Sequence, residues 1–467
     1  VQAAKSGKSD WVELYNASES DVDLSGWALS DSSSNFEKWP LSGSISAGGY
    51  LLVQKPNGQE LTLSASGERL YLSAGGGALA DSFDYGALRA GYSSGRSQEE
   101  GSEGERKLYA SPTPGAKNGG TTYAGYCAAP VFSKNGGYVS EPFFLEMSVP
   151  AGQMIYYTTD GSTPGESARR YDGPIELSKT TTVRAVALSE GRLRSDETVA
   201  TYLFGAQHTL PVVCLSMTQS DLDYVFGSTD RRDVRERQGY VEYYEADGTL
   251  GVRFPAGFRI AGNGTRQYAQ RAINLYLRGG YGRSKVTYPF FEDYGITEFK
   301  SLSLRNMGQD NHITRLRDAY FSMAVKGMNL DYMETRFAVV YLNGKYWGLY
   351  EFKENQNEDY LASRHEGVNP DDVMMSRSNT YVYNGHSNQD IKALFALARG
   401  NTADEGTFQK YLERADSAYF ADYLIAQCFF ANSDAYNQKY AGTLDRSLKW
   451  RPVYYDLDWA FMGCNPK

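Results

Sequence analysis

Short apolar segments separated by glycine-containing turns fill the first part of the chain, and this spacing restricts that part to antiparallel β structure. The segments "DWVELYN" and "GYLLVQ" have the pattern of strands, and "DVDLSG", "SAGG" and "PNGQ" supply the turns. Strands of this length at regular spacing favour a small β-sandwich. A chain of 467 residues is too long for one ordinary core. We therefore expect several domains.

A second strand-rich stretch extends over residues 121–205. "MIYYTTDGSTPGESARRYDGPIELSKTTTVRAVAL" alternates strands and turns, with a tight turn at Asp160-Gly161. Asp160 could be mistaken for a catalytic acid. A turn aspartate that accepts a hydrogen bond from its own backbone explains it without chemistry.

From residue 206 the pattern changes to a mixture of hairpins and helices. "LPVVCLSM" predicts a buried strand, Ser220 a helix cap, and Asn343-Gly344 a two-residue hairpin turn. Helical periodicity follows in "TRLRDAYFSMAVKGM", "NQDIKALFALARG", "EGTFQKYLERA" and "SAYFADYLIAQCFFA". Strands followed by helices indicate an α+β domain, which we expect to have two lobes with a cleft between them.

Composition excludes several classes of function. A net charge of −9 and a pI near 5.2 argue against a nucleic-acid partner. No apolar run of the length of a membrane span occurs. The four cysteines are far apart in the sequence, which makes a zinc site or a disulfide framework improbable. The start, "VQAAKSGKSDWVEL", shows no signal peptide, and we expect an upstream export signal to have been removed.

Acidic and amide residues follow two core segments near the end of the chain. Asp434 and Asn437 come after a helical segment, and Asp456 and Asp458 come about twenty residues later. Phosphoryl transfer needs an aspartate for the acceptor hydroxyl, an amide and a second aspartate for magnesium, and a cation with a glycine hairpin for the phosphates. Arg271 and the glycines of "GFRIAGNGT" supply the last two.

Structural explanations compete with this one. Alone, Asp434 is better explained as a turn or capping residue. Only its spacing to Asn437 and to the "DLD" segment, residues 456–458, favours a phosphoryl-transfer site. Asp456 and Asp458 share one face of a strand and would repel each other. A bound cation resolves that repulsion, and a nearby arginine would do so as well.

Three resemblances to known families cover the chain. "WVELYNASESDVDLSGWALSD", "ISAGGYLLV" and "SPTPGAKN" resemble a lamin-tail domain, and "YTTDGSTP" resembles the β-sandwich appended to chitobiases and hexosaminidases. "FRIAGNGTRQYAQRAINLYLRGGYG", "LSLRNMGQDNHITRLRDAYF", "YLNGKYWGLYEFKENQNEDYL", "FFANSDAYNQKY" and "YYDLDWAFMG" resemble the CotH-type spore-coat kinase family. These resemblances imply two all-β, immunoglobulin-like sandwiches at residues 1–120 and 121–205, followed by an α+β, two-lobed protein-kinase-like domain at 206–467. Relatives of that domain usually continue with a further helix, so we expect its second lobe to be cut short.

The kinase resemblance implies roles for the acidic and amide residues. Asp434 becomes the catalytic acid/base that orients the acceptor hydroxyl. Asn437 and Asp456 become ligands of Mg²⁺ or Mn²⁺, with Asp456 taking the part of the aspartate in the kinase D-F-G segment. Asp458 becomes a second metal ligand or a residue that holds the loop.

The same resemblance implies a nucleotide site. Gly262, Asn263 and Gly264 would lie against the phosphates of ATP, and the segment from Phe352 to Glu354 would lie near the adenine. Arg271 stands where the family usually has a phosphate-binding lysine. Its guanidinium group is bulkier and needs a different orientation to bind phosphate. We also consider Asp318 as a partner of Arg271, in the manner of the kinase glutamate–lysine pair.

We therefore expect an ATP- and Mg²⁺-dependent kinase that phosphorylates Ser or Thr on a protein outside the cell or on a bacterial surface. The β-sandwiches would anchor it through surface or glycan contacts. A catalytically silent pseudokinase carried by adhesion modules is the alternative that Arg271 favours. A carbohydrate-binding protein is the third alternative, suggested by the hexosaminidase-type module and the 37 tyrosines.

Overall fold

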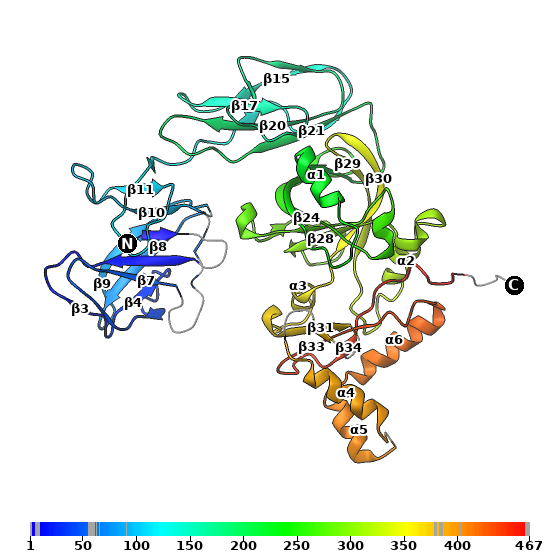
Figure 1. Ribbon diagram of the computed structural model, residues 1–467. Helices are drawn as coiled ribbons and strands as arrows, with labels where there is room; N and C mark the ends of the chain where they lie inside the picture. Colours follow the sequence, from blue (N-terminus) through cyan, green and yellow to red (C-terminus); the bar gives the residue numbers. More distant parts are fainter. Residues whose placement is uncertain are drawn as a thin grey trace.

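The computed structural model describes residues 2–4, 10–54, 61, 63–64, 66–89, 91–377, 381–382, 386–401 and 403–462. Its regular structure is mostly β, and the longest of its helices lie after residue 388 (Figure 1). Cys127, Cys214 and Cys428 are free thiols, and Cys464 lies outside the described residues. Among the helices of the described part, none has the length and apolar character needed to cross a bilayer.

The first body is a β-sandwich-type domain. One sheet has six strands in the order β12-β11-β10-β1-β2-β7 and another has four in the order β5-β4-β8-β9, with β3 and β6 pairing separately. The strands are β1 (Gln2–Ala4), β2 (Trp11–Tyr15), β3 (Val22–Asp23), β4 (Ala28–Ser30), β5 (Trp39–Pro40), β6 (Ser44–Ile45), β7 (Tyr50–Val53), β8 (Arg69–Ala74), β9 (Ala78–Asp84), β10 (Ser93–Arg96), β11 (Arg106–Tyr109) and β12 (Thr122–Tyr123). Buried Leu29, Leu70 and Phe83 belong to the core of this domain.

The second body is smaller and also all-β. Its main sheet has the order β14-β21-β20-β17-β18, and β15 pairs with β19 and β13 with β16. The strands are β13 (Val131–Phe132), β14 (Gly137–Val139), β15 (Phe143–Leu145), β16 (Met147–Ser148), β17 (Met154–Thr158), β18 (Arg169–Arg170), β19 (Ile175–Leu177), β20 (Thr181–Leu188) and β21 (Thr198–Phe204). Asp160 Oδ1 accepts hydrogen bonds from Ser162 N at 3.0 Å and Ser162 Oγ at 2.5 Å, so the turn interpretation of this aspartate is confirmed.

The third body is a closed seven-stranded barrel in the order β22-β23-β24-β25-β28-β30-β29. Phe254, Phe290 and Phe352 are among the buried side chains that fill it. Its elements are β22 (Val212–Ser216), α1 (Gln219–Phe226), β23 (Arg237–Tyr244), β24 (Leu250–Ile260), β25 (Ile273–Tyr276), β26 (Val286–Thr287), β27 (Glu298–Phe299), β28 (Ser301–Arg305), α2 (Arg317–Met323), β29 (Thr335–Leu342) and β30 (Lys345–Glu354). The hairpin expected at Asn343-Gly344 joins β29 and β30, with φ values of 49° and 73° at these two residues. Helix α1 is capped by Thr218 and not, as expected, by Ser220.

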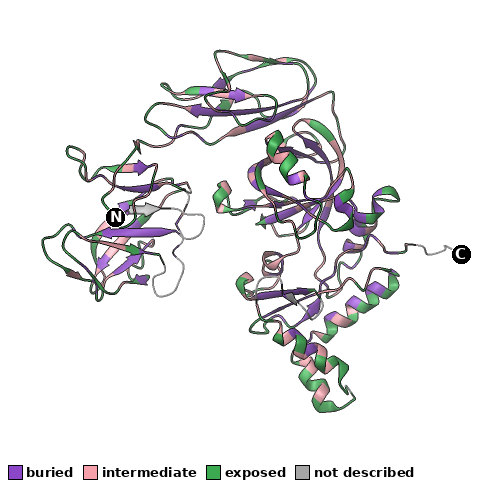
Figure 2. Cartoon of the chain, viewed as in Figure 1, coloured by how far each residue is buried: buried purple, intermediate pink, exposed green. Residues whose placement is uncertain are grey.

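The last body combines a small sheet with helices. Its sheet has the order β32-β31-β33-β34, and helices α4 to α6 lie beside and below it in Figure 1. Much of the surface of these helices is exposed (Figure 2). The elements are α3 (Glu358–Ala362), β31 (Val373–Arg377), β32 (Tyr381–Val382), α4 (Gln389–Arg399), α5 (Glu405–Leu412), α6 (Ser417–Phe429), β33 (Lys439–Thr443) and β34 (Arg451–Pro452). Short 3-10 turns complete the chain at Gly264–Gln267, Gly279–Tyr281, Gly308–His312 and Pro370–Asp372.

A buried glutamate joins the second sandwich to the barrel. Glu242 on β23 is fully buried, and its carboxylate accepts hydrogen bonds from Thr201 N at 3.1 Å and Thr201 Oγ1 at 2.6 Å on β21. Tyr244 Oη donates a third bond at 2.6 Å. A carboxylate buried in this way needs all of these partners. The contact therefore links the second sandwich to the barrel.

Candidate active site

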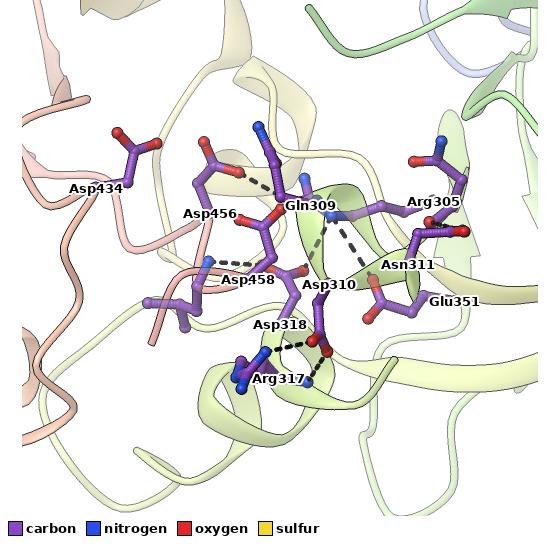
Figure 3. Close-up of polar contacts among 12 residues, drawn as sticks. Arg305, Gln309, Asp310, Asn311, Arg317, Asp318, Glu351, Asp434, Asp456 and Asp458 are labelled. Carbon is purple, nitrogen blue, oxygen red and sulfur yellow. Dashed lines mark hydrogen bonds and ion pairs between the residues drawn. The ribbon is translucent and has the colours of Figure 1, made fainter. Parts of the chain in front are cut away.

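Arg305 ends β28, and its guanidinium lies among four carboxylates (Figure 3). Its Nη2 is 2.9 Å from Asp456 Oδ1 and 3.2 Å from Asp458 Oδ2. Its Nε is 3.5 Å from Asp318 Oδ2 and 3.7 Å from Glu351 Oε2. Burial lowers the pKa of Arg305, but the surrounding carboxylates raise it well above its usual range. Arg305 is therefore the centre of a buried ionic cluster.

A second buried cation completes the cluster. Lys353 Nζ on β30 donates to Asp318 Oδ2 on α2 at 2.5 Å, and the two side chains are only 3% and 2% exposed. Asp318 Oδ1 accepts from the backbone N–H of Leu457 at 2.8 Å. Although burial raises the pKa of Asp318, Arg305 and Lys353 together hold it below its usual range. Asp318 thus fastens α2 to β30 and to the segment that carries Asp456.

Glu351 is the one member of the cluster whose oxygens find no hydrogen-bond donor in the described part of the chain. Its side chain is 0% exposed. Burial and the nearby Asp318 raise the pKa of Glu351 to about 8, even though Lys353 and Arg305 oppose the shift. This carboxyl group is therefore mostly protonated at neutral pH.

Asp456 has a backbone conformation that is uncommon outside glycine. Its φ is 63°, which costs energy and which proteins retain chiefly at functional sites. Asn437 Nδ2 donates to Asp456 Oδ2 at 2.8 Å, and Asn432 Nδ2 donates to the Asp456 carbonyl oxygen at 3.3 Å. The loop after α6 and the segment after β34 therefore hold each other in place through amide side chains.

Asp434 lies beside this pair, on the side of Asp456 that faces away from Arg305 in Figure 3. Its backbone carbonyl accepts from Asn437 N at 2.9 Å, which closes the turn. Burial and the charge of Asp456 raise the pKa of the half-buried Asp434 carboxyl. The structure thus brings Asp434, Asn437 and Asp456 together.

Asp458 holds the loop that follows β28. It is fully buried, and its Oδ2 accepts from the backbone N–H of Gln309 at 2.7 Å. Gly308 has a φ of 57°, and a Cβ at this position would overlap the Asp458 carboxylate. Burial raises the pKa of Asp458 to about 6 against the opposing charge of Arg305. Of the two roles expected for Asp458, holding a loop is the one with contacts in the structure.

Arg271 is not part of the cluster. Its guanidinium donates to the backbone carbonyl oxygens of Phe226 and Ser228, the latter at 3.1 Å. The expected pair between Asp318 and Arg271 is wrong, because Asp318 pairs with Lys353 and Arg305. The cation that reaches the "DLD" segment is therefore Arg305, which the sequence argument did not single out.

Phe352 and Glu354 were both expected near an adenine base. Phe352 is 0% exposed, and its ring packs against Tyr243 and Phe290 inside the barrel. This position leaves no ring face for a nucleotide and corrects the expectation for Phe352. Glu354 lines a cavity of about 230 Å³ at the junction of β30 and α3. Its carboxylate accepts hydrogen bonds from Tyr294 Oη and from the guanidinium of Arg364.

The glycine segment lies in the connection between β24 and β25. Gly262 has a φ of 85°, a left-handed conformation that favours glycine. Arg266 Nε donates to the Gly262 carbonyl oxygen at 2.7 Å, whereas Asn263 and Gly264 are exposed. The connection is therefore anchored at one end and open to solvent at its tip.

The proposed metal ligands make a sparse set. Within the described ranges, no group of three or more His, Cys, Asp or Glu side chains converges as a metal centre would. Magnesium is usually held by one or two carboxylates together with substrate phosphates and water. Asp456 and Asp458 fit that pattern, and Asp458 Oδ1 is buried with no partner among the described residues. Asn437 Oδ1 accepts a hydrogen bond from Arg377 Nη2 at 2.7 Å and would have to exchange it for a metal.

Two functional candidates, Arg305 and Lys353, were missed by sequence reasoning. Both carry a signal that could have found them. "SLSLR" and "YEFKE" alternate apolar and polar residues along strands, and the polar face of the second carries Glu351 and Lys353. Charged residues in alternation within strands flanked by apolar segments indicate a polar face covered by another element. Here that element is α2.

Three segments of the chain match known protein families. Residues 258–467 match the family model described as CotH kinase protein, residues 134–201 match the chitobiase/beta-hexosaminidase C-terminal domain, and residues 1–87 match the lamin tail domain. The three matches stand in the order expected from the sequence, so the three resemblances are confirmed. No curated protein matches the chain.

Proposed function

We propose that residues 206–467 form a protein kinase that transfers the γ-phosphoryl group of ATP to Ser or Thr side chains of a secreted or surface protein. The match of residues 258–467 to the CotH kinase model supports kinase-like activity in general. The observation that carries the finer proposal is the contact of Asn437 with Asp456 beside Asp434. An aspartate beside an amide–carboxylate pair supplies the hydroxyl-orienting and metal-holding groups that protein kinases use.

The architecture supports a division of residues 206–467 into two lobes. The barrel and the helical body are joined by the short segment between β30 and α3, and the ionic cluster draws on both of them. Arg305 and Lys353 come from the barrel, whereas Asp456 and Asp458 come from the segment after β34. We interpret the barrel as the nucleotide-binding lobe and the helical body as the acceptor-binding lobe, as in protein kinases.

Asp434 is assigned the role of base. It takes the proton of the acceptor hydroxyl as the oxygen of that hydroxyl bonds to the γ-phosphorus and the bond from this phosphorus to the bridging oxygen of ADP breaks. The raised pKa of Asp434 suits this task, because a general base works best when its pKa approaches the working pH. Asn437, Asp456 and Asp458 would hold Mg²⁺ or Mn²⁺, which supplies charge neutralisation at the phosphates when bound.

Arg305 replaces Arg271 as the proposed cation for the nucleotide phosphates. Its Nη2 already lies within hydrogen-bond distance of Asp456, so a phosphate bound there meets the cation and the metal-binding carboxylate together. The exposed tip formed by Asn263 and Gly264 is assigned to cover the phosphates. We propose that the adenine ring of ATP binds in the cavity lined by Glu354.

A labelled-ATP assay tests this function. With [γ-³²P]ATP and Mg²⁺ or Mn²⁺, we expect the wild-type chain to label itself or a Ser-rich acceptor protein. Asp434→Asn should lower kcat by about 10²- to 10⁴-fold while ATP binding persists. Asp456→Asn should lower both kcat and the affinity for ATP. Asp445→Asn, in an exposed turn, is the matched control and should remain active. Wild-type protein that neither transfers phosphate nor binds nucleotide with either metal would refute the proposal.

One observation favours a catalytically silent alternative. Arg305 already forms ion pairs with both Asp456 and Asp458, as it would in a retained structural cluster. In that case neither Asp434→Asn nor Asp456→Asn changes any activity, and Arg305→Met affects stability alone. The assay above separates the two functions.

We propose that the protein acts outside the cell or on its surface. The lamin-tail and hexosaminidase-type matches, together with the spore-coat character of the CotH family, support a place outside the cell or on its surface. The two sandwiches would then present the kinase. Cell fractionation with an antibody to the chain tests this, and recovery of the protein only in the cytosol would contradict it.

A further inference from the structure

Two basic residues lie side by side at one end of the two central strands of the last sheet, next to the candidate active site. Arg377 ends β31 and Lys439 begins β33, and the antiparallel register places them directly opposite each other. Residues opposite each other in an antiparallel pair project from the same face. Farther along that face Met375 and Ala441 pack with Tyr360 of α3. The two cations thus lie at the end of a sheet face that is turned toward α3.

Like charges in directly opposite positions destabilise a sheet unless something lies between them. Lys439 Nζ forms no hydrogen bond or ion pair with the described residues that would balance this repulsion. Its contact is with the ring of Tyr455, whose centroid is 4.0 Å away. Arg377 Nη2 donates to Asn437, and Arg305 Nη2 donates to Asp456, the residue that follows Tyr455. Three basic groups therefore converge on one small region.

Asp456 does not serve as the hydrogen-bond partner of Lys439. Both carboxylate oxygens of Asp456 are already engaged, Oδ1 by Arg305 at 2.9 Å and Oδ2 by Asn437 at 2.8 Å. Arg377 reaches the partner of Asp456, since its Nη2 donates to Asn437 Oδ1 at 2.7 Å. A lysine held near an occupied carboxylate and opposite an arginine is suited to an additional anion.

We propose that Lys439 and Arg377 form an anion site that binds the polyphosphate of the nucleotide, on the side of Asp456 opposite the barrel. The inference rests on the proposed kinase function for the identity of the ligand. A phosphate group fits because it accepts several charge-assisted hydrogen bonds at once and can satisfy two cations together. Lys439 is thereby a binding residue of the second lobe, where Arg305 is the corresponding cation of the barrel.

Calorimetric titration of the full chain with three probes tests the site: ATP with Mg²⁺, inorganic tripolyphosphate, and adenosine. We expect Lys439→Met to raise the Kd of the first two probes by about 10- to 100-fold, the range of one lost charge-assisted hydrogen bond, and to leave the Kd of adenosine unchanged. Lys439→Arg should keep most of the affinity. Lys449→Met, at an exposed turn lysine, is the matched control and should bind all three probes like wild type.

Thermal unfolding of the same variants separates binding from folding. Because Lys439→Met removes a like-charge pair, its Tm should equal or exceed that of the wild type in the absence of ligand. A lowered Tm together with proportional loss of all three probes would show a structural role and would overturn the proposal.

Kinetics distinguish this inference from the proposed function. If the wild type transfers phosphate and Lys439→Met leaves KM for ATP unchanged, the inference fails and the kinase function stands. A rise in KM only for an acceptor that already carries a phosphate would assign the site to the acceptor and would likewise overturn the nucleotide assignment. If no phosphate is transferred but tripolyphosphate binding depends on Lys439, the anion site stands and the kinase function fails.

Discussion

Replacing Glu351 by glutamine should change how stability depends on pH. In the folded chain this carboxyl group is fully buried without a hydrogen-bond donor among the described residues, and its pKa is raised to about 8. The folded protein therefore keeps the proton over a pH range in which the unfolded chain has lost it. Stability contributed by this proton is complete below the unfolded pKa of 4.5 and is lost as pH rises through the folded value near 8.

The size of the effect follows from the two pKa values. Between pH 5.5 and pH 9, proton linkage at this one group removes about 3 kcal/mol from the free energy of unfolding. The barrel and helical body together form a unit in the upper size range for which 1 kcal/mol shifts Tm by about 2–4 °C. Titration of Glu351 alone should therefore lower Tm by about 6–12 °C over this pH interval. Glu351→Gln keeps the shape of the side chain and removes the titration.

Scanning calorimetry at intervals from pH 5.5 to 9 measures this contribution. The wild-type curve also contains the titration of Asp458 and other buried groups, so the informative quantity is the difference between the two proteins. We expect that difference to grow in favour of Glu351→Gln as pH rises, with most of the change between pH 5.5 and 8 and little change above pH 8. Glu366→Gln, at an exposed site, should follow the wild type. Parallel curves for wild type and Glu351→Gln would refute the reasoning.

Three further predictions concern the same framework. Arg305→Met leaves buried carboxylates unpaired and should cost about 3–5 kcal/mol and abolish activity, whereas Arg271→Met should keep nucleotide affinity; thermal unfolding and ATP titration compare the two. Gly308→Ala forces a Cβ into Asp458 at a φ of 57° and should lower stability by about 2–5 kcal/mol in urea unfolding; an unchanged midpoint would contradict the assigned loop contact. Glu242→Ala leaves buried donors at the sandwich–barrel junction unsatisfied and should cost about 1–3 kcal/mol, with faster proteolytic cleavage between residues 204 and 212 as the readout.

Local signals in the sequence identified hairpins and the longer helices, whereas the strand expected to carry Asp456 and Asp458 is not formed, because β34 ends at Pro452 and Asp456 has a φ of 63°. Asn343-Gly344 adopts the left-handed values that a two-residue hairpin needs, and Asp160 closes its own turn. The long helices α4 and α6 appear where apolar residues recur with helical period. Asn437 and Asp456 could be brought together only through the spacing typical of a family, because their contact depends on how two loops meet.

The choice among cations could not be made from the sequence. Leu304 pairs with Ile273, so extending this register by one residue places Arg305 opposite Ala272. Arg271 lies before β25, and its guanidinium donates to the carbonyl oxygen of Ser228 instead. Which arginine meets Asp456 therefore depends on how the strands and loops of the barrel pair. The sequence contains both arginines within strand-like segments and gives no measure of register.

The charge balance of the cluster bears on how a metal could enter it. With Glu351 protonated at neutral pH, the negative charge of the remaining carboxylates nearly equals the positive charge of the surrounding cations. The carboxylates are Asp318, Asp434, Asp456 and Asp458, and the cations are Arg305, Lys353 and Lys439. A bare divalent cation would have to compete with basic groups already in place, at a further electrostatic cost. A metal that arrives with a nucleotide brings its own negative charge, and that charge can also satisfy Lys439. We therefore expect Mg²⁺ to bind detectably only together with ATP, and calorimetric binding of Mg²⁺ alone at similar affinity would contradict this account.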